Sequence, residues 1–378
     1  MKRFAALALL LCLLLAVPAQ GAALTVNAQS YVLMEKETGQ VLAAANEHEQ
    51  LEPASVTKVM TILLVMEAID SGRLRYDDVV TTSAYAASMG GSQVYLKENE
   101  QMTVEDLLKA VCVASGNDAA VALGEHIGGS MDNFVSMMNQ RAAELGMEDT
   151  HFVNCTGLPA EGHLTSAYDI ALMSRELILH HPDIRTFTTI WMDTLRDGAF
   201  TLANTNRLVR YYEGTTGPKT GSTDAAGYCL SATAERDGME LIAVVLKSPT
   251  SNDRFEGAKA MLNYGFASYQ VVHAAPEQVL PPVAVTMGER PSVQPVLGEG
   301  STLLLEKGTQ LEQEITLETQ VPAPVEQGQQ LGTLRLTAGE NVVAEIPLVA
   351  GESVARLGYG QILERMLRMS FLLEPFES

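Results

Sequence analysis

Residues 53–61 read PASVTKVMT, and this stretch places a serine and a lysine three positions apart at the start of a helical pattern. Apolar residues recur at helical spacing from Val59 until the Asp-Ser-Gly of residues 70–72 ends the pattern. Because residues i and i+3 share one face of a helix, the Ser55 hydroxyl and the Lys58 amine can meet there. A lysine kept neutral by burial or by a cationic neighbour can deprotonate a serine, so Ser55 is a candidate nucleophile and Lys58 its candidate base.

Two further motifs carry groups that such a nucleophile needs. Ser115-Gly116-Asn117 precedes a helix-prone stretch, where a second serine can relay a proton and an amide can hold a substrate peptide bond. Lys219-Thr220-Gly221-Ser222 lies just before a predicted strand at residues 228–234 and offers a charge and a hydroxyl to an anionic ligand. Each motif has an ordinary alternative: a surface Ser-Lys pair, a capped loop and a plain turn. Ser-x-x-Lys alone is expected about once or twice in a chain of average composition.

The order of the three motifs resembles that of penicillin-binding proteins and serine β-lactamases. Ser115 follows Ser55 by 60 positions and Lys219 follows Ser115 by 104, spacings similar to those of low-molecular-mass D-alanyl-D-alanine carboxypeptidases. The similarity covers about residues 28–272. Further segments that resemble this subgroup are Gly91-Ser92, Asn154-x-x-Gly157-Leu158, His163-x-Thr165, Asn204-Thr205-Asn206 and residues 262–266.

The resemblance implies an activity and its residues. It implies a serine-type carboxypeptidase that removes the terminal D-alanine from peptidoglycan stem pentapeptides through an acyl-enzyme on Ser55. The sequence has no His-Glu-x-x-His, His-x-His or Cys-x-x-Cys spacing, so no metal or cofactor is expected. β-Lactam antibiotics mimic the substrate and are implied as covalent inhibitors. His163 and Asp169 are implied as structural. The implied catalytic residues are Ser55, Lys58 and Ser115, and the implied substrate-binding residues are Asn117, Lys219, Thr220, Gly221, Ser222 and Arg254.

The resemblance also implies a role in the reaction for each of these residues. Ser115 would pass a proton to the departing D-alanine, and Asn117 would orient the substrate amide. Lys219 and Thr220, in the Lys-Thr-Gly motif, would bind the terminal carboxylate, which Arg254 would help to neutralise. The backbone N–H groups of Ser55 and Ser222 would form the oxyanion hole.

Three alternatives use the same motifs. A class A β-lactamase needs a Glu-x-x-Leu-Asn segment between the second and third motifs, and none occurs between Asn117 and Lys219. A D,D-endopeptidase shares all three motifs and stays open. A non-catalytic cell-wall binding protein has no need of both Ser55 and Lys58, so the intact pair argues against it.

The chain divides into four predicted regions. Residues 1–23 combine Lys2-Arg3, a 14-residue apolar run and small residues, which predicts a signal peptide and an extracytoplasmic location. The run is shorter than the ~20 residues that a transmembrane anchor, the alternative, would need. Residues 24–273 mix helices with two hairpins and predict the α/β catalytic domain, with a largely antiparallel sheet of the penicillin-binding protein/β-lactamase type. Residues 274–352, opening with a proline-rich, linker-like stretch, predict a small all-β domain.

Residues 353–378 form the last region. An amphipathic helix is predicted over residues 357–373, with apolar side chains on one side and arginines on the other. Packing against the β domain is one interpretation. The resemblance favours the other, peripheral attachment to the outer face of the cytoplasmic membrane.

Composition sets the remaining limits. The 378 residues include 25 Lys and Arg against 46 Asp and Glu, a formal net charge of −21. Since phosphate neutralisation needs clustered Lys and Arg, nucleic acid is excluded as a predicted partner. After signal cleavage the cysteines would be Cys112, Cys155 and Cys229, an odd and scattered set that predicts buried thiols rather than a disulfide framework.

Overall fold

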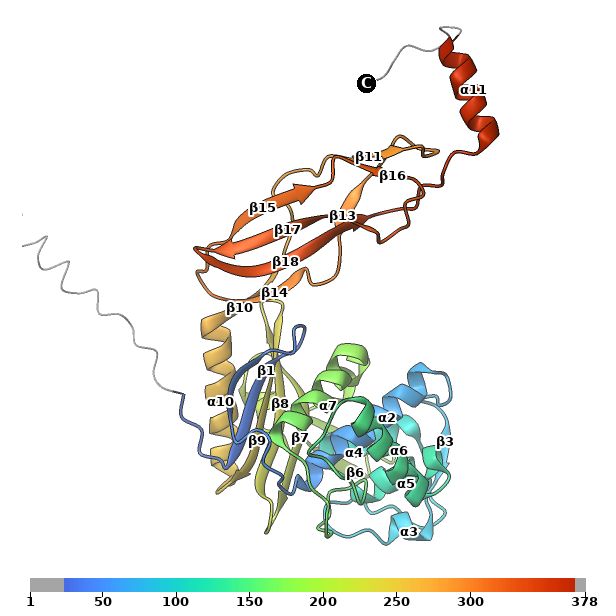
Figure 1. Ribbon diagram of the computed structural model, residues 1–378. Helices are drawn as coiled ribbons and strands as arrows, with labels where there is room; N and C mark the ends of the chain where they lie inside the picture. The colour runs from blue at the N-terminus through green and yellow to red at the C-terminus, as the bar shows by residue number, and fades with distance from the viewer. Residues whose placement is uncertain (1–23, 371–378) are drawn as a thin grey trace, which may run out of the picture. The chain divides into compact units, whose positions relative to one another are not determined.

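The computed structural model describes residues 24–370, which form two compact units (Figure 1). Within the described range, the first unit comprises residues 24–33, 43–234 and 242–264, and the second comprises residues 34–42, 235–241 and 265–370. The predicted signal peptide lies outside the described residues. The limits proposed from the sequence for the catalytic and β domains stay a prediction.

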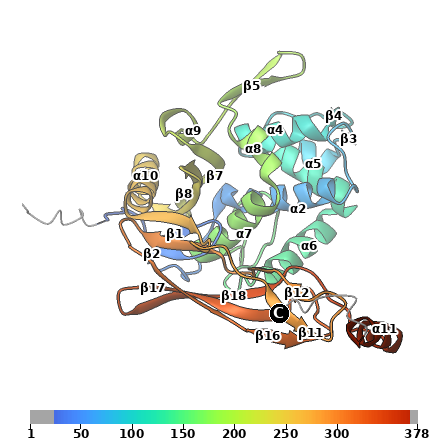
Figure 2. The ribbon, with the colours of Figure 1, turned by 90° about the horizontal axis from the view of Figure 1, so that it is seen from above.

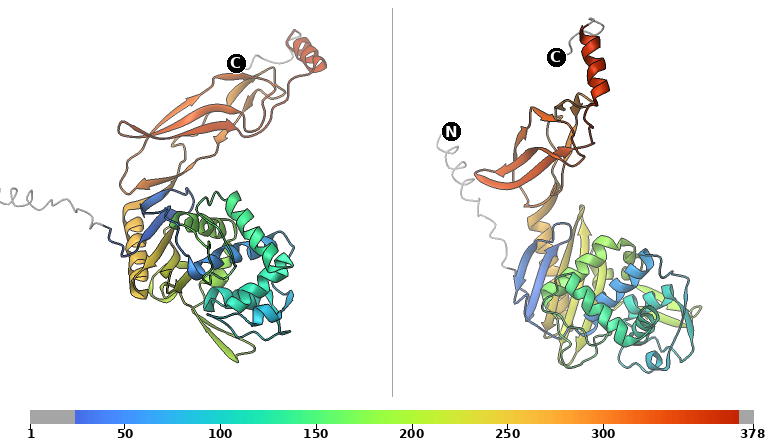
Figure 3. Two further views of the ribbon diagram at one scale, coloured as in Figure 1. Left: turned by 60° about the horizontal axis from the view of Figure 1, so that its bottom comes forward. Right: turned by 45° about the vertical axis from the view of Figure 1, so that its right-hand side comes forward.

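A five-stranded sheet forms the centre of the first unit, with strand order β2-β1-β9-β8-β7. Helix α10 covers one face of this sheet, and α2 and α7 lie on the other (Figures 1 and 2). The two views of Figure 3 show the same order of layers. Both predicted hairpins are confirmed. The elements are β1 Ser30–Glu35, β2 Val41–Ala45, β7 Thr215–Thr223, β8 Gly227–Arg236, β9 Met239–Ser248 and α10 Ser251–Ser268.

The strand predicted after the Lys-Thr-Gly motif is confirmed as β8, but the interpretation of the motif as a plain turn is wrong. Residues 219–222 are themselves part of strand β7, which pairs antiparallel with β8 through Lys219↔Ser231 and Ser222↔Tyr228. The segment resembles a turn in its sequence because it contains Gly217, Pro218 and Gly221. Pairing with β8 overrides this weak local preference, because strand propensity depends strongly on tertiary context.

Helices provide most of the rest of the first unit. Helix α2 is buried along nearly its whole length, as expected for a helix that is apolar all round. The hydroxyls of Thr103, Ser130 and Ser166 cap α4, α6 and α7 by accepting a hydrogen bond from a backbone N–H of the first turn. The bounds are α2 Lys58–Asp70, α3 Ala84–Ala87, α4 Val104–Ala114, α5 Asn117–Gly128, α6 Met131–Glu144, α7 Ala167–His180, α8 Arg185–Thr188 and α9 Leu208–Tyr211, with short strands β3 Val79–Thr81, β4 Gln101–Thr103, β5 Met192–Leu195 and β6 Phe200–Ala203.

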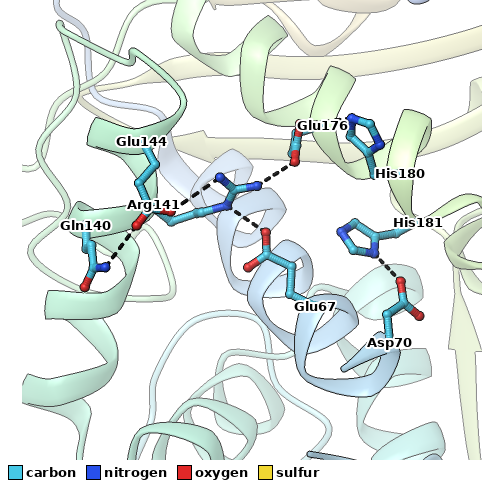
Figure 4. A network of polar contacts seen from close by, with 8 residues as sticks. All are labelled: Glu67, Asp70, Gln140, Arg141, Glu144, Glu176, His180 and His181. Carbon is cyan, nitrogen blue, oxygen red and sulfur yellow. Dashed lines mark hydrogen bonds and ion pairs between the residues drawn. The ribbon is translucent and has the colours of Figure 1, made fainter. Parts of the chain in front are cut away.

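Ion pairs join three of these helices (Figure 4). The Arg141 guanidinium on α6 donates to Glu67 on α2 at 2.7 Å and to Glu176 on α7 at 2.5 Å. A second contact joins Asp70, the last residue of α2, to His181 after α7. These contacts hold the C-terminal half of α2, whose first residue is Lys58.

The second unit is mainly strands, as predicted. Its sheets have the orders β10-β14, β12-β11-β16 and β13-β18-β17-β15. The proline-rich, linker-like stretch that opens this region is only partly linker, because β11, β12 and β13 lie within residues 283–297. Pro295 fits as the first residue of an edge strand, where a missing N–H costs no ladder bond. The bounds are β10 Tyr269–His273, β11 Val283–Thr286, β12 Ser292–Val293, β13 Pro295–Leu297, β14 Thr302–Glu306, β15 Glu312–Leu317, β16 Gln320–Pro322, β17 Gln330–Ala338 and β18 Asn341–Ala350.

Helix α11, Tyr359–Ser370, ends the described chain. Its apolar side chains face solvent: Leu363 is 59% exposed, Met366 60% and Leu367 49%. The interpretation that this face packs against the β domain is therefore wrong for the described residues. Within residues 24–370, no helix has the length and apolar character needed to cross a membrane.

Candidate active site

The proposed nucleophile lies on a single 3₁₀ turn, Ala54–Thr57, and not within the α-helix that the sequence pattern predicts. Helix α2 begins one residue later, at Lys58. A 3₁₀ turn brings residues i and i+3 into line, so the predicted contact still forms. The Lys58 ammonium donates to the Ser55 hydroxyl at 3.0 Å.

Lys58 is completely buried and surrounded by neutral acceptors. Its Nζ also donates to Asn117 Oδ1 at 2.6 Å and to the Thr156 carbonyl at 2.8 Å. Burial, followed by the charge of Lys219, lowers the pKa of Lys58 well below its ordinary value. Burial therefore makes the ammonium proton of Lys58 easier to lose, and the resulting neutral amine can accept the proton of Ser55.

The backbone just before the nucleophile is strained. Ala54 has φ of +47°, a left-handed conformation that costs an alanine about 1–2 kcal/mol. Gly157 packs directly on it, since a Cβ there would lie 1.8 Å from the Ala54 carbonyl oxygen. Only a glycine allows this approach, so Gly157 fixes the turn that presents Ser55.

His163 supports the same turn. Its Nδ1 accepts from the Val153 N–H at 2.9 Å, so Nε2 carries the proton and donates to the Thr57 hydroxyl at 2.8 Å. That hydroxyl in turn donates to the Ala54 carbonyl at 2.9 Å. Burial lowers the pKa of His163 to about 4, so the ring is neutral. These contacts agree with the structural role implied for His163.

Asp169 also has structural contacts. Its carboxylate accepts from the Asp149 N–H at 2.9 Å and from the Thr150 hydroxyl at 2.6 Å. Its own N–H donates to the capping hydroxyl of Ser166 at 3.2 Å.

The second motif joins helices α4 and α5. Ser115 directly follows the last residue of α4, with φ of +62°, and is buried. Asn117 begins α5 two residues later and is fixed from both ends of its amide. Its Oδ1 accepts from Lys58, and its Nδ2 donates to the Gly90 carbonyl at 2.6 Å.

Asp118 is a structural residue that the sequence analysis missed. Its buried carboxylate accepts from the N–H groups of Val94 at 3.1 Å and Leu96 at 3.0 Å. It thereby fixes the loop over residues 90–96 next to Asn117. The available signal was an acidic residue in the first turn of a helix directly after the Ser-x-Asn motif.

Strand β7 forms the opposite wall. Lys219 is 1% exposed, and its Nζ donates to the Thr220 carbonyl at 2.9 Å. Burial and, to a smaller extent, the charge of Arg254 lower the pKa of Lys219 to about 7. A Cβ on Gly221 would lie 2.8 Å from the Ser55 nitrogen, so β7 passes close to the nucleophile turn, while Ser222 is exposed.

Arg254 lies in the first turn of α10 and binds backbone. Its Nη1 donates to the carbonyls of Gly221 at 2.9 Å and Cys229 at 3.3 Å. Its guanidinium lies 4.8 Å from the Phe255 ring centre, and burial lowers its pKa to about 10. Contact with a substrate carboxylate stays a prediction for this residue.

The structure thus joins Ser55, Lys58 and Asn117 through direct hydrogen bonds and brings Gly221 against Ser55. The predicted buried thiols are confirmed. Burial raises the pKa of Cys112 and Cys155 to about 12 and that of Cys229 to about 11, and all three are free.

Comparisons with known proteins agree with this geometry. Residues 17–250 match the family described as D-alanyl-D-alanine carboxypeptidase, and residues 270–356 match the C-terminal domain of penicillin-binding protein 5. The D-alanyl-D-alanine carboxypeptidase DacF of Bacillus subtilis is 43% identical over 90% of this chain and 89% of its own.

Two solved structures are also similar. Penicillin-binding protein 5 from Haemophilus influenzae has a TM-score of 0.77 and 31% identity, over 88% of this chain and 98% of its own. Penicillin-binding protein D2 from Listeria monocytogenes, in its ampicillin-bound form, has a TM-score of 0.60 and 33% identity, over 65% of this chain and 100% of its own.

Proposed function

Because the chain belongs to the D-alanyl-D-alanine carboxypeptidase family of serine hydrolases, we propose that Ser55 is the residue its substrate acylates. The observation that carries the proposal is the buried Lys58 amine, 3.0 Å from the Ser55 hydroxyl and bonded to neutral acceptors. A base must lie within hydrogen-bond reach of the proton it removes, as Lys58 does, and burial lowers the pKa of Lys58 in the direction that a base requires.

The reaction proceeds in two stages. Ser55 Oγ attacks the carbonyl of the penultimate D-alanine while Lys58 takes its proton. The tetrahedral oxyanion is stabilised by the N–H groups of Ser55 and Ser222, supported by the close approach of β7 at Gly221. Ser115 passes a proton to the departing amine, and D-alanine leaves. Water then hydrolyses the ester on Ser55.

Substrate recognition uses the other polar groups of the site. Asn117 is held rigidly by Lys58 and Gly90, so its amide is pre-oriented for a peptide bond of the substrate. Lys219, Thr220 and Gly221 receive the terminal carboxylate. Arriving negative charge restores the protonated form of Lys219, which burial alone disfavours. Arg254, beside Gly221, adds positive charge to this end of the site.

The proposal includes peptidoglycan stem pentapeptides as substrates and β-lactams as covalent inhibitors. The similarity to an ampicillin-bound penicillin-binding protein supports the second. It also includes export, supported by the basic and apolar pattern of residues 1–23, and peripheral attachment to the outer face of the cytoplasmic membrane. The exposed apolar side of α11, next to Arg365 and Arg368, supports attachment through that helix.

The experiment measures D-alanine release from diacetyl-L-lysyl-D-alanyl-D-alanine by wild-type protein, Ser55→Ala and a matched control, Ser136→Ala. Ser136 is exposed on α6 and its hydroxyl only bonds Asp132 of the same helix. We expect release by wild type and the control and none by Ser55→Ala. Equal release by Ser55→Ala would contradict the proposal.

A further inference from the structure

The hydroxyl of Thr205 lies against β7, the strand proposed to bind the carboxylate of the substrate. Thr220 Oγ1 donates to Thr205 Oγ1 at 2.7 Å, and Thr220 is 4% exposed. The two residues come from different elements, since Thr205 follows β6 and Thr220 lies on β7. A threonine hydroxyl has one proton to donate and two lone pairs that accept. The Thr205 proton is therefore not used in this hydrogen bond and can be donated to another acceptor.

The segment that carries Thr205 is held firmly. The amide of buried Asn204 donates to the carbonyls of Thr188 at 3.2 Å and Ile190 at 2.8 Å. The amide of buried Asn206 donates to the carbonyl of Gly217, on the same strand as Thr220, at 3.3 Å. Two polar side chains thus fix the backbone on either side of Thr205.

A third contact joins this segment to the second motif. The N–H of Thr205 donates to the Val113 carbonyl at 3.1 Å, two residues before Ser115. The segment therefore connects the end of α4 to β7, the two elements that carry the proton-relay and carboxylate-binding residues of the proposed mechanism. A hydroxyl held at this junction has little freedom to move away from Thr220.

We infer that Thr205 is a positioning residue that turns the Thr220 hydroxyl toward the terminal carboxylate of the substrate, an inference that rests on the proposed function. Without substrate, Thr220 donates to Thr205. When a carboxylate arrives, the Thr220 O–H rotates to donate to a carboxylate oxygen, and the Thr205 O–H then donates to a lone pair of the Thr220 oxygen. No covalent bond changes. Two hydroxyls in series polarise each other, which strengthens the bond to the anion.

The test separates hydrogen bonding from shape. Thr205→Val keeps the volume of the side chain but removes the donor, whereas Thr205→Ser keeps the donor. For diacetyl-L-lysyl-D-alanyl-D-alanine we expect Thr205→Val to raise KM roughly 3- to 10-fold, the usual worth of one net hydrogen bond, with kcat within about twofold. We expect Thr205→Ser to restore KM to within about twofold of wild type.

Two controls make the result specific. Thr201→Val, an exposed threonine on β6, should leave KM unchanged. The same peptide with a C-terminal amide offers no anion, so its kcat/KM should be equal in wild type and Thr205→Val. Unchanged KM in Thr205→Val, or failure of Thr205→Ser to restore it, would overturn the inference. No D-alanine release by wild type would instead overturn the proposed function.

Discussion

The candidate active site and helix α11 both invert the usual distribution of side chains between interior and surface. The active site buries two lysines completely or nearly so, and α11 exposes leucine and methionine. In the active site, both buried amines have partners: Lys58 has three acceptors, and Lys219 has the Thr220 carbonyl. The apolar face of α11 remains exposed within the described chain.

The two regions differ in what offsets the free-energy cost of their unusual side chains. A buried cation without partners would cost several kcal/mol, so the active site compensates internally, and burial makes the Lys58 proton easier to lose. An exposed apolar face costs free energy that an external apolar surface can recover. We therefore expect the active site to act on a small substrate and α11 to contact an apolar surface outside the chain.

The largest expected effect comes from removing the Lys58 amine. Lys58→Met should lower kcat/KM for D-alanine release by about 10² to 10⁴-fold, the usual worth of a general base, because Lys58 is the proposed acceptor of the Ser55 proton. It should also lower the free energy of unfolding by about 1–3 kcal/mol, since Asn117 Oδ1 and the Thr156 carbonyl lose a donor. Steady-state kinetics and urea unfolding measure both, with exposed Lys97→Met as the control. A kcat/KM within threefold of wild type would contradict the role of Lys58 as the base in the active site.

The pH dependence follows from the lowered pKa of Lys58. Only the neutral amine can take the serine proton, so the acylation rate rises with pH as Lys58 deprotonates and is lost as pH falls. Burial lowers this pKa, so the midpoint should lie well below 10.5, with the rate falling about tenfold per pH unit below it. Stopped-flow measurement of β-lactam acylation from pH 5 to 11 tests this. A midpoint at or above 10.5 would show that the site does not lower the pKa of Lys58.

A smaller loss should follow from adding one methyl group beside the nucleophile turn. Gly157→Ala would place a Cβ 1.8 Å from the Ala54 carbonyl oxygen, so the turn must shift. We expect acylation to slow at least about tenfold, since an ångström of misplacement has large kinetic cost. Gly72→Ala is a matched control, because its φ of +72° is similar but its Cβ would meet nothing within 4 Å. Equal acylation rates in the two variants would contradict the role of Gly157.

The smallest effect on catalysis, and a clear one on location, should come from α11. Leu363→Asp combined with Met366→Asp should lower binding to phosphatidylglycerol vesicles at least about tenfold, because it removes apolar area and adds negative charge. D-alanine release should not change. Gln361→Asp, on the polar side, is the control for charge alone. Vesicle co-sedimentation measures binding, and equal binding of all proteins would refute attachment through this helix.

Local sequence predicted those features of the site that depend on neighbours along the chain. The Ser55–Lys58 contact needs only a turn with i, i+3 geometry, and the hydrophobic pattern located α2. The fold class and the family rested on three motifs in order, which no single motif would have justified.

The remaining features depend on segments far apart in the sequence. Gly157 meets Ala54 across about a hundred residues, and Asp118 holds a loop that precedes it by more than twenty. The strand character of Lys219-Thr220-Gly221 came from pairing with β8, against its local composition. The hydroxyl pair of Thr205 and Thr220 likewise exists only because a loop and a strand pack together.

The most direct test of the central claim is mass-spectrometric mapping of the site labelled by a penicillin. Our account predicts a covalent acyl group on the peptide that contains Ser55, with no label on the Ser55→Ala protein. Label on another serine, or undiminished labelling of Ser55→Ala, would contradict the assignment of Ser55 as the nucleophile.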